Sequence, residues 1–228
     1  MKQDTKQRED GRATRERLLD CAEMLTAAKG FASVTSKEIC QQAGANLAAV
    51  NYHFGSREGL YEAMLYRVHD RIISQTTLQD IAEGAGTPRE KLERFFDSLL
   101  WSVQGGGRAG ADERAIQVWL REALADSTAF VPILRHLATT KFPWVRKLFA
   151  EYLGRSESDP VLYSGILHTM APILLLNLKD FFPLAAEEEP MRVLHDPAFH
   201  TAMRMYAFAG LDALKKEANT SCSTMKID

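Results

Sequence analysis

Cysteine is scarce in this sequence, and the cysteines that occur are poorly placed for a shared chemical role. Among 228 residues there are three, Cys21, Cys40 and Cys222, which lie far apart in the chain. Neither a structural zinc site nor a disulfide framework has this number and spacing. The sequence therefore predicts reduced thiols in a cytoplasmic protein, with no metal and no cofactor.

Long hydrophobic runs and an excess of one charge are also lacking. The longest nearly apolar run, Met170 to Leu178, is well short of the roughly 20 residues that a membrane span needs. The charged N-terminus is not followed by the apolar stretch of a signal peptide. With 28 basic and 30 acidic side chains, the net charge of −2 favours neither an anionic membrane nor DNA. We expect no membrane partner, and a nucleic acid would have to bind a local patch.

Diagnostic catalytic motifs are missing as well. The nucleophile motif G-x-S-x-G and the zinc motif H-E-x-x-H do not occur. Residues 105–110 formally satisfy G-x-G-x-x-G, but they follow a helical pattern rather than a strand, which favours a loop. No catalytic residue is assigned, and an enzyme remains the alternative class.

What the sequence does contain is helical periodicity in almost every segment. Apolar residues recur at spacings of three and four, and no alternating strand pattern competes. The prediction is an all-α fold with helices near residues 12–29, 37–43, 47–54, 60–81, 88–103, 112–125, 129–153, 160–178 and 197–216. We expect a flexible basic arm (1–11), a first domain that contains the two shortest helices (12–60), a larger helical domain (61–216), and a flexible tail (217–228).

Two of the expected helices are short and are joined by a tight turn, Gly44-Ala45-Asn46. Gly44 is suited to end the first helix, and Asn46 is suited to cap the second. This arrangement is typical of a helix-turn-helix, which inserts its second helix into the major groove of DNA.

The residues of this motif divide into two kinds of candidate DNA contact. Asn46 and Asn51 can hydrogen-bond base edges, whereas Leu47 and Ala48 offer only methyl contacts to thymine. Because hydrogen-bonding groups are few, we expect DNA shape to contribute to specificity. Groups suited to phosphate lie around the second helix, namely Thr35, Ser36, Lys37, Tyr52, His53 and Arg57. Taken singly, each has an ordinary structural explanation, but their grouping favours DNA; Phe54 is assigned to the core.

The stretch from Thr14 to Leu65 resembles the N-terminal domain of tetracycline-repressor-like (TetR family) transcriptional regulators. The resemblance rests on K-G-F, V-T-S-K-E-I and Y-H-F-G-S-R-E-G-L, which occur in family order. One departure is Thr26, where an aromatic residue is common in the family. The A-A-V-N-Y-H-F-G-S-R-E-G-L-Y form looks most like a CecR-like subgroup.

This resemblance implies roles for individual positions of the motif. It implies that Thr14 touches the DNA backbone, and that Thr35 and Lys37 approach DNA from the first helix of the motif. It further implies that Tyr52, His53 and Arg57 hold phosphates, whereas Leu47, Ala48 and Asn51 face the bases.

For the rest of the chain, the resemblance implies a domain that binds a small-molecule effector and forms a homodimer. The apolar helices expected near 160–178 and 197–216 are candidates for the dimer interface. Trp119, His168 and Asn177 are candidates to face a hydrophobic or aromatic effector, whose binding would release a repressor from a pseudo-palindromic operator of double-stranded DNA. A helical ligand-binding dimer without functional DNA binding is a further alternative.

Overall fold

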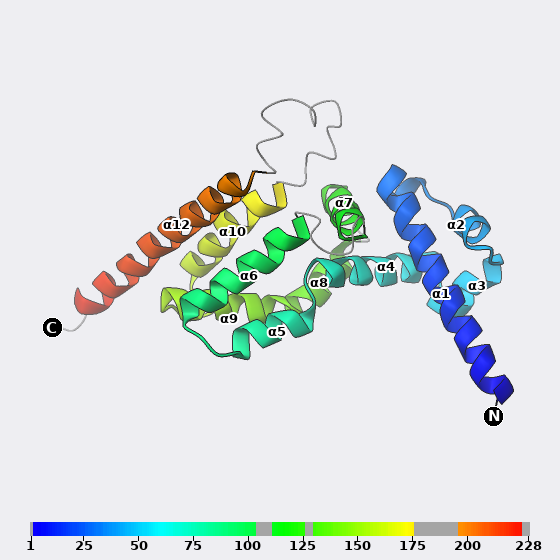
Figure 1. The fold of residues 1–228 in the computed structure, drawn as a ribbon, viewed down its shortest axis with the longest axis horizontal. Helices are drawn as coiled ribbons and strands as arrows, with labels where there is room; N and C mark the ends of the chain where they lie inside the picture. The colour runs from blue at the N-terminus through cyan, green and yellow to red at the C-terminus, as the bar shows by residue number, and fades with distance from the viewer. Residues whose placement is uncertain (1, 104–110, 126–129, 176–195, 225–228) are drawn as a thin grey trace. The chain divides into compact units, whose positions relative to one another are not determined.

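The computed structural model describes residues 2–103, 111–125, 130–175 and 196–224. Throughout these ranges the regular structure is helical and no strand occurs, so the all-α prediction is confirmed (Figure 1). The helices are α1 (Lys2–Lys29), the 3₁₀ helix η1 (Phe31–Ser33), α2 (Ser36–Ala43), α3 (Leu47–Phe54), α4 (Arg57–Ile72), α5 (Gln75–Glu83), α6 (Pro88–Val103), α7 (Ala111–Leu124), α8 (Val131–Thr140), α9 (Phe142–Leu153), α10 (Pro160–Leu175) and α12 (Pro197–Thr224).

The chain forms two compact units whose boundaries differ from the expected domains. The first unit comprises residues 1–72 and 110–136, and the second comprises residues 73–109 and 137–228. The expected boundary near residue 60 placed α4 and α7 with the larger domain. In the structure these two helices pack against each other and against α1, so they belong to the unit that contains the helix-turn-helix.

Two of the expected helices are each divided into two. The pattern near 60–81 breaks at Ser74, whose extended backbone and hydroxyl, which accepts from the Thr77 N–H, begin a new helix, α5. The pattern near 129–153 breaks at Lys141, and Pro143 occupies the first turn of α9. A proline is tolerated there because it has no N–H to donate, whereas it would interrupt the middle of a helix.

The two ends of the chain also differ from expectation. Helix α1 begins at Lys2, so most of the segment expected as a flexible arm (1–11) is helical. Helix α12 extends to Thr224 and takes in most of the expected flexible tail (217–228). Both extensions lack proline, and the single Gly11 within α1 costs a helix only about 1 kcal/mol relative to alanine.

The core of the second unit is rich in phenylalanine. Phe96 lies edge-on to Phe149 and to Phe208, with ring centroids 6.2 Å and 5.4 Å apart. Phe95 also contacts Phe149 edge-on, at 6.2 Å. These rings come from α6, α9 and α12, so aromatic packing joins three helices that are distant in sequence.

Candidate nucleic-acid interface

Helix α2 begins with a complete capping box. The Thr35 hydroxyl accepts from the Glu38 N–H at 3.2 Å, and the Glu38 carboxylate accepts from the Thr35 N–H at 2.9 Å. Lys29, at the end of α1, donates to the same carboxylate at 2.7 Å. These hydrogen bonds, that of Lys29 first and then those of Thr35, lower the pKa of Glu38 to about 2. The start of α2 is therefore fixed to α1 by an ionised carboxylate.

The turn between α2 and α3 has the expected chemistry. Gly44 adopts a left-handed conformation, with φ of 61°, which suits glycine because it has no Cβ. Arg17 of α1 donates from Nε to the Ala43 carbonyl at 3.3 Å, near the end of α2. The Asn46 side chain accepts from the Ala49 N–H at 2.9 Å and so caps α3. The side-chain oxygen of Asn46 therefore caps α3 rather than contacting a base.

Helix α3 has one buried position and an exposed face. Val50 is buried, whereas Leu47 is 57% exposed and Ala48 and Asn51 are also exposed. On a helix, residues 47 and 51 are four apart and residue 48 follows the first, so the three share one side. The structure thus brings together the three side chains that were predicted to face bases.

Beyond this face, Tyr52 and His53 lie at the end of α3. Tyr52 is 83% exposed, and its ring meets the His53 ring edge-on at 4.8 Å. His53 is half-buried beside Gly11 of α1, where an added Cβ would lie 3.9 Å from His53 Cε1. Phe54, predicted to be a core residue, is half-buried, and the Arg15 guanidinium lies 5.1 Å from its ring centroid.

The first helix of the motif contributes one cation and two hydroxyls. Lys37 is exposed, and within the described part of the chain the structure records no ion pair for it. Ser36 is half-buried, and the Thr35 hydroxyl already bonds Glu38. The Thr14 hydroxyl donates to the Asp10 carbonyl within α1 at 2.9 Å. Of these side chains, Lys37 is the best placed for a phosphate.

Arg57 differs from its predicted role. Its Nη2 donates to the carbonyls of Phe31 at 2.6 Å and Val34 at 2.8 Å, and its guanidinium lies 4.2 Å from the centroid of the Phe31 ring. A guanidinium that donates to two carbonyls and stacks on a ring uses its donors and its face for contacts within the protein. The assignment of Arg57 to a DNA phosphate is therefore revised to a role in holding η1 against α4.

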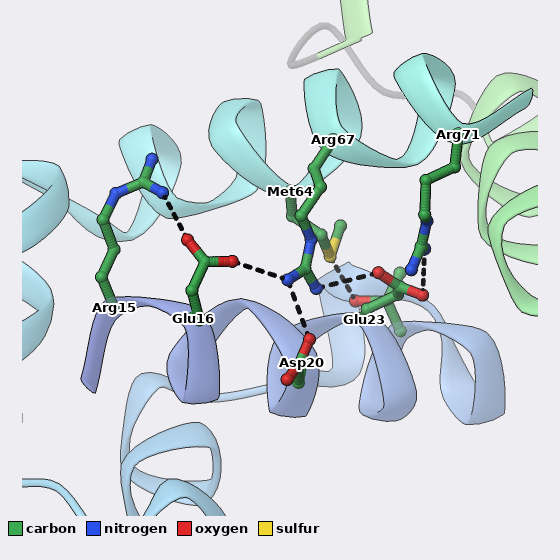
Figure 2. Close-up of polar contacts among 8 residues, drawn as sticks. Arg15, Glu16, Asp20, Glu23, Met64, Arg67 and Arg71 are labelled. Carbon is green, nitrogen blue, oxygen red and sulfur yellow. Dashed lines mark hydrogen bonds and ion pairs between the residues drawn. The ribbon is translucent and has the colours of Figure 1, made fainter. Parts of the chain in front are cut away.

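Sequence reasoning overlooked a cluster of charges between α1 and α4. Glu23 is 1% exposed, and it accepts from Arg67 at 3.0 Å and from Arg71. Arg67 also pairs with Glu16 at 3.3 Å and Asp20 at 2.8 Å, and Figure 2 shows both arginines of α4 pointing toward the acids of α1. In the sequence, Glu23 lies four residues after Leu19, within the apolar stripe of α1. An acidic residue at such a position indicates a buried charge that needs a partner.

The predicted effector residues that the structure describes belong to different units. Trp119 is buried in the first unit, where its ring lies 4.5 Å from that of His69 and 4.9 Å from that of Phe130. His168 lies on α10 in the second unit and lines a cavity of about 280 Å³. Asn177 lies outside the described residues. The other residues that line the cavity are Phe96, Thr169, Pro172, Ile173, Phe199, Ala202, Met203, Arg204, Tyr206 and Ala207.

Neither a metal centre nor a membrane span is found in the part of the chain that the structure describes. No three or more His, Cys, Asp or Glu side chains there are grouped as metal ligands. None of the described helices is long and apolar enough to cross a membrane.

Comparison with known proteins finds a family model that matches the residues of this candidate interface. The model for "Bacterial regulatory proteins, tetR family" matches residues 18–64. The HTH-type transcriptional regulator TtgR of Pseudomonas putida is 26% identical over 96 residues, which are 41% of this chain and 46% of TtgR. UidR of Escherichia coli, another HTH-type transcriptional regulator, is 23% identical over 199 residues, 86% of this chain and 91% of UidR. The chain thus matches less than half the length of TtgR.

A solved structure has the same fold. A TetR-like transcriptional regulator from Rhodococcus aligns with a TM-score of 0.61 at 16% sequence identity. The alignment covers 87% of this chain and 96% of the Rhodococcus chain, so the likeness of fold extends beyond the helix-turn-helix.

Proposed function

Because the chain belongs to the TetR family of bacterial regulatory proteins, we propose that it is a DNA-binding transcriptional regulator whose α3 enters the major groove. One observation carries this proposal. Thr35 caps α2 and Asn46 caps α3, and this pair of short helices exposes Leu47, Ala48 and Asn51 on one side of α3 while Val50 is buried on the other. The finer resemblance to the CecR-like subgroup stays a prediction.

In this proposal, the contacts divide between bases and phosphates. Asn51 hydrogen-bonds a base edge, and Leu47 and Ala48 contact thymine methyl groups. Tyr52, Lys37 and His53 bind phosphates, which supply affinity but carry no sequence information directly. With one amide on the exposed face of α3, specificity also depends on the shape of the duplex.

Selection of duplexes from a random library tests the proposal. We expect enrichment of a two-fold symmetric site, with an affinity that falls steeply as salt rises because bound phosphates release counterions. Absence of enrichment even at low salt would contradict DNA-binding regulation and favour a helical ligand-binding dimer. The enzyme alternative receives no support from the regulators to which this chain is similar.

We also propose that α10 and α12 form the interface of a homodimer. Helix α10 exposes Tyr163 and Leu167, and α12 exposes Met205 and Tyr206, which is 85% exposed. Both helices belong to the second unit and pack against each other. A second copy would cover these apolar side chains, and its two-fold symmetry would match half-sites about 34–36 Å apart. Analytical ultracentrifugation that finds a monomer at micromolar concentration would contradict this.

The cavity in the second unit is the proposed effector site. Its lining is mostly apolar, with His168, Thr169 and Arg204 as polar groups, which suits a hydrophobic or aromatic effector. We propose that an effector favours a conformation whose two helix pairs no longer fit the half-sites, so that a repressor is released in the cytoplasm.

Filling the cavity tests this assignment. Ala202→Trp should abolish binding of the apolar fluorophore 1-anilinonaphthalene-8-sulfonate, whereas Ala198→Trp, an exposed position near the start of the same helix, should not. Equal binding by both variants would place the probe elsewhere. An effector that binds tightly but leaves operator affinity unchanged would contradict the coupling.

A further inference from the structure

Glu122 of α7 is a buried carboxylate that bonds the chain leading into the helix-turn-helix. It is 3% exposed, and both of its oxygens accept hydrogen bonds within the first unit. Oε1 accepts from the Phe31 N–H at 3.0 Å, and Oε2 accepts from the Tyr61 hydroxyl at 2.9 Å. A single side chain of α7 therefore contacts both η1 and α4.

The segment that Glu122 bonds is held from several sides. The centroid of the Phe31 ring lies 4.5 Å from that of the Tyr61 ring, and the guanidinium of Arg57 lies 4.2 Å from the centroid of the Phe31 ring. Arg57 also donates to the carbonyls of Phe31 and Val34, so α7 binds an N–H of η1 while α4 binds one carbonyl of η1 and one of the residue that follows it. Directional hydrogen bonds at both ends leave this short helix little freedom.

The position of η1 decides where α2 begins. Val34 follows η1 directly and is buried, and Thr35 is the N-cap of α2. Because so short a stretch of chain joins Phe31 to Thr35, a displacement of Phe31 moves the cap of α2. Through the tight turn at Gly44, the same displacement reaches α3.

We propose that Glu122 is a positioning residue through which α7 sets the orientation of α2 and α3 for DNA. This rests on the proposed function, since it names the residue that connects α7 with the DNA-binding helices. An unpaired buried carboxylate is costly, and here the Phe31 N–H of η1 and the Tyr61 hydroxyl of α4 are the donors that satisfy it. Movement of α7 would therefore reach the DNA surface through the Phe31 N–H.

Alanine substitution at Glu122 tests this, with Leu124→Ala as its control, since Leu124 lies on the same helix and its side chain is 68% exposed. Glu122→Ala should weaken binding to the selected operator at least about tenfold, because two buried donors lose their acceptor. Affinity for random duplex at low salt should change by less than about threefold, because it depends on phosphate contacts. Leu124→Ala should change neither.

Rescue by conservative variants separates positioning from general destabilisation. Glu122→Gln retains an oxygen for the Phe31 N–H and offers an N–H to the Tyr61 oxygen, so operator affinity should return to within about threefold of the wild type. Tyr61→Phe keeps the bond to Phe31 and should have an intermediate effect. If Glu122→Gln were as defective as Glu122→Ala, a negative charge rather than the positioning bonds would matter, and the proposal would be overturned.

Hydrogen exchange gives a readout that does not depend on DNA. In Glu122→Ala the Phe31 amide should exchange at least about tenfold faster, while amides of α9 and α12 should keep wild-type rates. Unchanged exchange at Phe31 would overturn the proposal even if operator binding fell. If Glu122→Ala did not fold, Tyr61→Phe would decide by operator affinity: an intermediate loss would support the proposal, and wild-type affinity would overturn it. If the wild type bound no operator, the proposed function would fail, while exchange at Phe31 would still decide the role of Glu122.

Discussion

The two units of this protein are stabilised by different kinds of contact. In the first unit, the buried carboxylates of Glu23 and Glu122 accept hydrogen bonds from donors on other helices. In the second, Phe95, Phe96 and Phe149 form an aromatic cluster. Charge-assisted hydrogen bonds have a defined geometry, whereas apolar packing depends mainly on volume and area. The difference indicates that the unit with the proposed DNA-binding helices is built for a fixed geometry and the second unit for adaptable packing.

The largest loss of stability is expected from a substitution that breaks the buried charge cluster of the first unit. Glu23→Ala leaves the partly buried guanidinium groups of Arg67 and Arg71 without their shared buried acceptor, and we expect the free energy of unfolding to fall by about 3–5 kcal/mol. Asp20→Ala is the matched control, because Asp20 also pairs with Arg67 but its side chain is 66% exposed. The control should cost less than about 1 kcal/mol. Equal losses in urea unfolding would contradict the importance of burial.

A smaller effect is expected from a conservative change in the aromatic core of the second unit. Phe149→Leu retains most of the apolar volume, so we expect a loss of about 1–2 kcal/mol in thermal or urea unfolding. Phe149→Ala removes the ring and should cost about 3–5 kcal/mol. If leucine were as damaging as alanine, the second unit would be as demanding in geometry as the first, and the comparison would fail.

The two units should also respond to opposite extremes of pH. In the first unit, the hydrogen bonds from Lys29 and Thr35 lower the pKa of Glu38 to about 2. The stabilisation from its ionised form is complete above the ordinary glutamate pKa and is lost as pH falls from that value toward 2. Burial, followed by the hydrogen bond to Asp212, raises the pKa of Tyr152 in the second unit to about 12. This contribution is complete below the ordinary tyrosine value and is lost between about pH 10 and pH 12.

Circular dichroism across pH checks both limits, with one variant for each unit. Glu38→Gln should remove the acid-side loss below about pH 4.5 that is due to this group, and Tyr152→Phe should remove the alkaline loss above about pH 10. An alkaline transition that is the same in Tyr152→Phe and in the wild type would assign that loss to other groups.

The smallest effects are expected on the exposed surface that we propose for DNA, where substitutions should not change folding. Asn51→Ala should cost about 1–3 kcal/mol of discrimination at one base position, because its amide would no longer bond that base. Lys37→Gln should weaken all duplexes by a similar factor and lower the salt dependence by about one counterion. Lys147→Gln, in the second unit, serves as the control. Loss of sequence preference in Lys37→Gln would contradict a phosphate contact.

Local signals predicted the helix-turn-helix, whereas the contacts that position it are not local. The caps at Thr35 and Asn46 and the left-handed Gly44 involve neighbours in sequence, which patterns of residue type can reveal. Arg57, by contrast, bonds a carbonyl 26 residues away, and Glu122 bonds an N–H 91 residues away. Their side chains give no sign of these partners in sequence, which is why Arg57 was assigned to DNA and Glu122 was overlooked.

The break between α4 and α5 was missed for a related reason. Apolar spacing continues from α4 into α5 with Ile72, Ile73 and Leu78, and this pattern obscured the cap at Ser74. Periodicity reports which side of a helix is apolar, but a cap decides where the helix ends. The expected boundary near residue 60 was wrong because the pairing of α4 with α7 depends on tertiary packing.

Gly59 has a consequence for genetics. A Cβ at this position would overlap the Phe54 carbonyl oxygen, so the backbone between α3 and α4 would have to shift. Glycine has no side chain with which to touch DNA, yet every replacement adds that Cβ. Under the proposed function as a repressor, a screen for alleles that fail to repress should therefore recover many different codons at position 59, whereas at Leu47 or Ala48 some replacements should give alleles with altered operator preference.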